Sequence, residues 1–72
     1  MFYSISYFNM QGEFKYVDRQ TFQEVTKALI RATLHLSLFN TEVQYAKVIY
    51  QGQKVHKVVR EIKLRNTEPK YQ

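Results

Sequence analysis

Hydrophobic and polar residues alternate at the start of the chain. Between Phe2 and Phe8, the side chains of Tyr3, Ile5 and Tyr7 alternate with two serines. A period of two places successive side chains on opposite faces of an extended strand, so that one face can be buried. The alternation predicts a half-buried strand over residues 2–8.

A turn and a second strand are expected next. Glycine adopts positive φ without steric cost, so Gln11-Gly12 predicts a hairpin turn. Residues 14–17 are rich in β-forming types. A two-residue loop would pair Asn9 with Phe14 and Tyr7 with Tyr16. The core face of this hairpin would then contain Tyr3, Ile5, Tyr7, Phe14 and Tyr16.

Hydrophobic residues then recur at steps of three and four, which predicts an amphipathic helix ending near Ser37. Asp18 and Thr21 are alternative N-caps, and Thr21 to Glu24 has the form of a capping box. The buried stripe would contain Phe22, Val25, Leu29, Ala32 and Leu36. The polar face would contain Gln23, Lys27, Arg31 and His35.

Two structures compete for the last third of the chain. Val55, Val58, Val59 and Ile62 fit the spacing of a helix. Their β-branched side chains favour a strand instead, and the run from residue 43 to 50 is also rich in β-formers. Gln51-Gly52 supplies a turn between the two runs. We therefore expect a second hairpin, with a helix as the alternative.

These elements predict an α+β fold of the ββαββ type, with an antiparallel sheet of two hairpins and one amphipathic helix packed on one face. Residues 1–65 would form a single small domain, and residues 66–72, with the only proline, a frayed tail. A core of this size is marginal, so a homodimer or another partner would be a natural supplement.

Charge and composition narrow the cellular setting. Eleven Lys and Arg against six Asp and Glu give a net charge of +5, which suits an anionic partner. Cysteine is absent, and the start of the chain has neither a basic segment nor a long apolar one, so we expect no export and a cytoplasmic location. No apolar run approaches the roughly 20 residues of a membrane span, so no membrane partner is expected.

Pairing the last two strands across Gln51-Gly52 separates the basic residues between two faces. One face would carry no acid and is the candidate surface for nucleic acid or a protein partner, with Tyr45, Lys47, Lys54, His56 and Arg60. The other would hold Lys57 and Lys63 beside Glu42 and Glu61. The first face also carries apolar residues, of which Ile62 and Leu64 form a candidate dimer or partner interface. A bulge that exchanges the faces partway along is the alternative.

The sequence offers no catalytic, metal or cofactor motif. Two isolated histidines and no cysteine disfavour a metal site, and two glycines leave no phosphate-binding loop. The acids are spread along the chain and no serine lies in a nucleophile elbow. We therefore expect no cofactor and no enzymatic activity.

Two functions remain. The first is a small basic protein that contacts nucleic acid or a nucleoprotein complex through a positively charged sheet face, with affinity that falls with salt. The second is an inhibitor or adaptor that blocks a larger host enzyme. In size, charge and lack of motifs the chain resembles accessory proteins of phages and mobile elements, such as anti-CRISPR and host-takeover proteins. The plain alternative for the basic residues is a solvated surface that maintains solubility.

Overall fold

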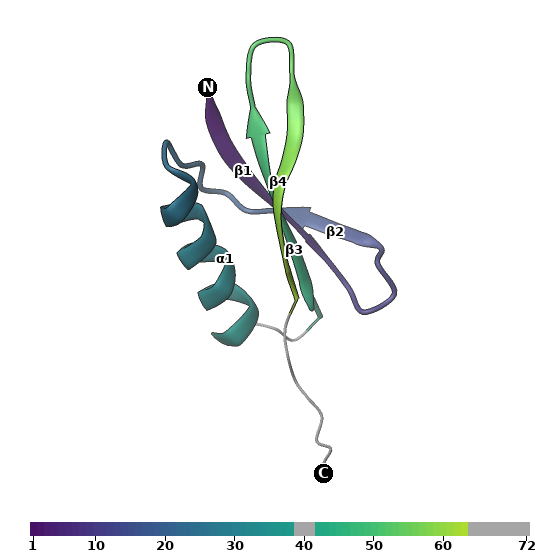
Figure 1. Cartoon of the computed structure of the whole chain (residues 1–72). Helices are drawn as coiled ribbons and strands as arrows, with labels where there is room; N and C mark the ends of the chain where they lie inside the picture. Colours follow the sequence, from purple (N-terminus) through teal and green to yellow (C-terminus); the bar gives the residue numbers. More distant parts are fainter. Residues whose placement is uncertain (39–41, 64–72) are drawn as a thin grey trace.

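The computed structural model describes residues 1–38 and 42–63, which form one antiparallel sheet covered on one face by a helix (Figure 1). The strands lie in the order β2-β1-β3-β4, so the two hairpins meet where β1 pairs with β3. This arrangement confirms the predicted ββαββ fold. The elements in chain order are β1 (Phe2–Phe8), β2 (Phe14–Val17), α1 (Val25–Leu38), β3 (Tyr45–Gln51) and β4 (His56–Lys63).

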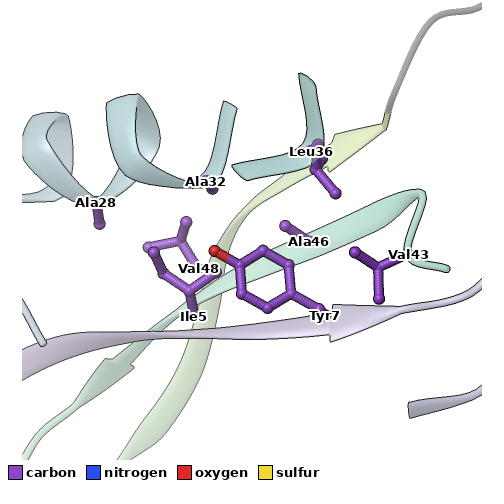
Figure 2. Packing of buried hydrophobic residues seen from close by; sticks show 8 residues of the cluster. All are labelled: Ile5, Tyr7, Ala28, Ala32, Leu36, Val43, Ala46 and Val48. Atoms are coloured by element: carbon purple, nitrogen blue, oxygen red, sulfur yellow. The ribbon is translucent and has the colours of Figure 1, made fainter. Parts of the chain in front are cut away.

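The core lies between α1 and the two central strands. As the alternation predicted, Ile5 and Tyr7 of β1 are fully buried, and they pack with Val48 of β3 (Figure 2). On the helix, Ala28 and Ala32 face the sheet, and their small side chains permit a close approach of the two layers. The complete buried cluster is Ile5, Tyr7, Ala28, Ala32, Leu36, Val43, Ala46 and Val48.

The first hairpin has the predicted location but a different register near its turn. Tyr7 pairs with Tyr16, as expected, whereas the predicted Asn9–Phe14 pair is wrong because Phe14 lies opposite Phe8. Lys15 is the extra residue of a bulge at this point, and it moves Phe14 out of the predicted core face. The side chain of Phe14 is 57% exposed.

The loop of this hairpin is longer than two residues. The backbone N–H of Asn9 donates to the carbonyl of Glu13 over 2.9 Å, which leaves three residues between them. The Asn9 side-chain oxygen accepts hydrogen bonds from the N–H groups of Gln11 and Glu13, each at 2.9 Å. Gly12 takes the left-handed conformation with φ of 85°, the usual last position of a three-residue hairpin loop.

The helix starts later than predicted. Phe22 exchanges two backbone hydrogen bonds with Tyr3, at 2.7 and 3.0 Å, so it extends the sheet as an isolated bridge. Its side chain still packs against the core. The helix begins at Val25, and the carbonyl of Glu24 accepts from the N–H of Ala28. The predicted capping box at Thr21 is therefore wrong, because the sheet holds the backbone at Phe22.

The last third of the chain is a hairpin, as preferred, and not a helix. Its turn is closed by a hydrogen bond from the Gly52 N–H to the Val55 carbonyl, 2.8 Å long, and so involves more residues than Gln51-Gly52. A bulge at Val59 shifts the register, since Ile49 pairs with Val58 but Val48 pairs with Arg60. The faces of β4 are exchanged at this point.

Candidate functional site: the open face of the sheet

Within residues 1–38 and 42–63, no second layer of helix or strand packs on the face of the sheet opposite α1, although Ser4 and Ser6 on that face are buried. Its side chains occupy alternate positions of the strands, and residues paired across strands share a face. Four of its apolar members have exposed side chains. We call this surface the open face and define it by Phe2, Ser4, Ser6, Phe8, Phe14, Val17, Tyr45, Lys47, Ile49, Gln51, His56, Val58, Glu61 and Lys63.

A row of three aromatic residues and one lysine crosses all four strands of the open face. Phe14 of β2 pairs with Phe8 of β1, Phe8 with Tyr45 of β3, and Tyr45 with Lys63 of β4. The rings of Phe8 and Phe14 meet edge to face, with their centroids 5.9 Å apart. Four residues from four strands therefore form one continuous row, which we call the aromatic row.

Two ammonium groups lie over the rings of this row. The Lys47 Nζ is 4.9 Å from the centroid of Phe8, and the Lys63 Nζ is 5.7 Å from the centroid of Tyr45. Both distances fit cation–π contacts, which are weak at an exposed site. The lysines thus cover ring faces, and a planar, negatively charged ligand that stacks on these rings must displace the ammonium groups, which can then contact its negative charge.

An open-sided pocket of about 380 Å³ lies at this end of the sheet. Its walls come from three strands and from the loop of the first hairpin. The pocket brings together two rings, two lysines and one acid. The lining residues are Phe8, Gly12, Tyr45, Ala46, Lys47, Glu61, Ile62 and Lys63.

The structure brings together three of the five predicted binding residues on the open face. Tyr45 and Lys47 lie in or beside the pocket. His56 pairs with Gln51 near the turn of the second hairpin and is hydrogen-bonded to its side chain. Gln51 in turn donates to the Ser4 hydroxyl over 2.9 Å.

Arg60 and Lys54 lie elsewhere. Arg60 pairs with Val48, whose side chain is in the core, so it lies on the helix side of the sheet, and its Nη1 donates to the Val59 carbonyl over 2.8 Å. Lys54 is exposed in the turn of the second hairpin, which projects beyond the other strands (Figure 1). The predicted grouping of these two with Lys47 on one face is wrong, because the bulge at Val59 moves Arg60 to the other face and Lys54 lies in the turn, outside the paired strands.

The same bulge corrects three further assignments. Glu61 and Lys63 lie on the open face, with Glu61 directly opposite Lys47, so the predicted absence of acid from this face is wrong. Ile62 lies opposite Ala46 and packs against the core from the helix side. Leu64, the other predicted interface residue, lies outside the described residues.

Sequence reasoning missed Phe8, Phe14 and Lys63 as members of the candidate site. Phe14 was expected in the core, and Lys63 on the opposite face. The bulges at Lys15 and Val59 determine both positions. The one available signal was the run of apolar residues on the predicted basic face, which suggested that a bulge would exchange the faces.

A second polar cluster lies between α1 and the first hairpin. The buried carboxylate of Asp18 accepts hydrogen bonds from the Tyr7 hydroxyl at 2.6 Å, from Arg31 Nε at 2.8 Å and from the Gln20 N–H at 3.0 Å. Burial alone would raise the pKa of Asp18, but the hydrogen bonds from Arg31, Tyr7 and Gln20 outweigh it and lower the pKa. Burial, and then donation to Asp18, raises the pKa of Tyr7. Asp18 therefore acts as a structural anion here and not as the predicted helix cap.

His35 belongs to the same region. The prediction that it lies on a polar face of the helix is wrong. Its ring stacks on Tyr7 with 4.3 Å between centroids, and its Nε2 lies 2.9 Å from the Tyr16 hydroxyl. Burial lowers the pKa of His35, and Arg31 lowers it further against the opposing effect of Asp18. The contacts with β1 and β2 give this histidine a packing role.

The described part of the chain contains neither a metal-binding cluster nor a membrane-crossing helix. Within residues 1–38 and 42–63, no three His, Asp or Glu side chains lie close enough together to bind a metal ion. Over the same residues, no helix has the length and apolar character needed to cross a bilayer.

Comparisons with protein-family models, with curated proteins and with solved structures found no match to this chain.

Proposed function

We propose that this chain is a non-catalytic protein that binds single-stranded nucleic acid on the open face of its sheet. The observation that supports this function is the aromatic row with its adjacent lysines. Bases stack on aromatic side chains with a gain of about 1–3 kcal/mol per base, largely independent of sequence. Lys47 and Lys63 lie over the rings of Phe8 and Tyr45, and once a stacked base displaces them their flexible side chains can neutralise the phosphates of the same strand.

The bound nucleic acid is expected to be single-stranded, because stacking on the aromatic row needs unpaired bases. A duplex would need an element that enters a groove. The described helix packs on the sheet through Ala28, Ala32 and Leu36. Its outward side carries exposed Ile30 and Leu34, which do not suit a phosphate backbone. The net charge of +5 supports attraction to either form and does not separate them.

Fluorescence anisotropy with labelled single-stranded DNA and RNA, repeated at rising salt, tests this function. We expect affinity to fall linearly on a log–log plot against salt concentration. Replacement of Lys47 and Lys63 by Gln should weaken binding and reduce that slope by about two. The matched control replaces Lys27 of the helix and Arg60 on the helix side of the sheet by Gln, with the same change in charge. If both double variants change the affinity and its salt dependence equally, the lysines act only through net charge, and the proposed surface is contradicted.

A protein partner is the second candidate, and the exposed apolar residues of the open face favour it. Phe2, Val17 and Val58 are 38%, 50% and 43% exposed on this surface. An apolar surface large enough to be continuous commonly marks an interface, and these three residues share one face of the sheet. In this case the chain would act as the inhibitor or adaptor considered above. A host protein would be captured on the immobilised chain and washed at rising salt. Binding that is insensitive to salt, lost in Val58→Asp and kept in the Lys47, Lys63 double variant would favour this function over the first.

A further inference from the structure

The pocket of the open face contains a carboxylate where phosphate binding alone would disfavour one. Glu61 is the one acid among the open-face residues, and it lines the pocket with Lys47 and Lys63. Lys47 is its cross-strand partner and Lys63 is two residues further along β4. A negative charge at this position repels the phosphates of any strand that the lysines attract. A carboxylate at this position suits a ligand that presents hydrogen-bond donors near its phosphates.

The carboxylate of Glu61 is available to such a ligand. Within residues 1–38 and 42–63 the only salt bridge joins Arg31 to Asp18. The side chain of Glu61 is exposed, and the pocket beside it is open to solvent. An ionised carboxylate accepts at both oxygens and donates at neither, so the group that it recognises must present hydrogen-bond donors.

We propose that this pocket binds a guanine base of a single-stranded nucleic acid, with Glu61 accepting hydrogen bonds from the N1–H and the N2 amino group. The inference rests on the proposed function and deepens it. Guanine presents two adjacent N–H donors on its Watson–Crick edge, the edge that an unpaired base exposes. Two parallel hydrogen bonds to one carboxylate are charge-assisted and set the orientation of the base.

The other bases match this carboxylate poorly. Adenine and cytosine each present one amino group beside a ring nitrogen that accepts, and this nitrogen would face the second carboxylate oxygen. Uracil and thymine present a single N–H between two carbonyl oxygens. Each mismatch leaves acceptors opposed, and a bidentate contact is generally worth enough to discriminate on the order of tenfold between bases.

The remaining walls of the pocket suit a nucleotide. The rings of Phe8 and Tyr45 supply flat apolar surfaces for the base, and neighbouring bases can continue along the aromatic row to Phe14. Lys47 lies across from Glu61 on β3 and Lys63 lies two residues further along β4, so each can contact a phosphate while the acid contacts the base. In this pocket the two lysines would neutralise phosphates while Glu61 recognises the base.

The test compares the affinities of labelled thymine oligonucleotides that carry a single central guanine, adenine or cytosine. A single guanine avoids the association of guanine-rich strands. We expect the guanine oligonucleotide to bind wild type roughly tenfold more tightly than the others. Glu61→Gln should remove this preference while binding of the all-thymine strand is retained or strengthened, because a negative charge is lost. Glu24→Gln, with the same charge change at the start of the helix, should keep the preference.

The outcomes distinguish this inference from the proposed function. Equal affinity for all four oligonucleotides would overturn guanine recognition and leave the proposed function standing. Absence of binding to any strand at low salt would overturn both. A preference that survives Glu61→Gln would overturn the role of Glu61. Guanosine monophosphate should bind more weakly than the guanine oligonucleotide. Equal affinity would indicate that the ligand of the pocket is a free nucleotide and not a strand. Amide shifts of Gly12, Ala46 and Ile62 on titration should locate the site.

Discussion

The hydroxyl of Tyr7 donates to the carboxylate of Asp18 over 2.6 Å, within a cluster that joins β1, the segment after β2 and the helix. Arg31 approaches the same carboxylate from α1, with Nε 2.8 Å from one oxygen and Nη2 3.3 Å from the other. The Asp18 side chain is nearly inaccessible to solvent, whereas that of Arg31 is about one-third exposed. The cluster therefore fixes the path of the chain between the first hairpin and the helix.

Replacement of Asp18 by Asn should destabilise the protein by about 2 kcal/mol. The amide has nearly the same shape but removes the charge that strengthens the hydrogen bonds from Tyr7 and Arg31. Urea unfolding followed by circular dichroism measures the loss. Glu24→Gln, an exposed acid, is the matched control and should change stability little. Equal losses in the two variants would contradict a structural role for Asp18.

Stability should also fall in acid because of Asp18. Its pKa is lower in the folded protein than its ordinary value of about 3.9, so the unfolded chain binds the proton more readily. Its contribution is complete above that ordinary value and is lost as pH falls through the folded pKa. The unfolding free energy, measured at a series of pH values below about 5, should therefore decrease more steeply in wild type than in Asp18→Asn. Parallel curves would exclude Asp18 as the cause.

His35 should titrate below its ordinary pKa of about 6.5, because burial disfavours the imidazolium. The folded state then binds fewer protons than the unfolded state, so stability is complete above about pH 6.5 and decreases as pH falls below it. NMR titration of the His35 ring protons measures the midpoint directly. A midpoint above the ordinary value would contradict the burial of this ring between Tyr7, Tyr16 and the helix.

The aromatic row can be tested at Phe14, whose side chain is 57% exposed and contributes little to the core. Phe14→Ala should leave the unfolding free energy nearly unchanged but lower the affinity for single-stranded nucleic acid by about 1–3 kcal/mol, the value of one stacked base. Leu34→Ala, 49% exposed on the helix, removes apolar surface elsewhere and should not alter affinity. Unchanged binding by Phe14→Ala would remove β2 from the proposed surface.

Gly12 offers a test of the first loop. A Cβ there would meet no atom within 4 Å, so space does not restrict the position, but φ is 85°. Gly12→Ala should cost about 1–2 kcal/mol through the left-handed conformation alone. Gly12→Asn should cost less, since asparagine tolerates this conformation. The comparison uses urea midpoints of the two variants, and equal losses would contradict the assigned backbone strain.

The order of the elements could be predicted from the sequence because the periods of two and of three to four are local signals. The alternation of Tyr3, Ile5 and Tyr7 reports the packing of β1 directly. The preference for a strand over a helix at residues 56–63 followed from β-branched side chains, which have the same preference wherever the strand lies. These parts of the prediction needed no tertiary information.

The membership of the open face could not be predicted in the same way, because it depends on register. One extra residue at Val59 places Glu61 opposite Lys47 and moves Arg60 to the helix side, and one at Lys15 moves Phe14 out of the core. Neither Lys15 nor Val59 has a sequence signature of a bulge. His35 was misplaced for a different reason, since its neighbours Tyr7 and Tyr16 are brought to the helix by the hairpin.

The bulge at Val59 also bears on pairing between the sheet edges of two molecules. Within the described residues, β4 is the outermost strand on its side of the sheet, and its free backbone groups would suit pairing with a second molecule. A bulge breaks the regular spacing of those groups, and Lys57, Arg60 and Lys63 place like charges along the strand. Two molecules brought together along β4 would oppose positive charge to positive charge in every register that does not place Glu61 opposite a lysine or arginine. The irregularity that assembles the pocket thus also disfavours amyloid-like stacking of a small, aromatic-rich chain.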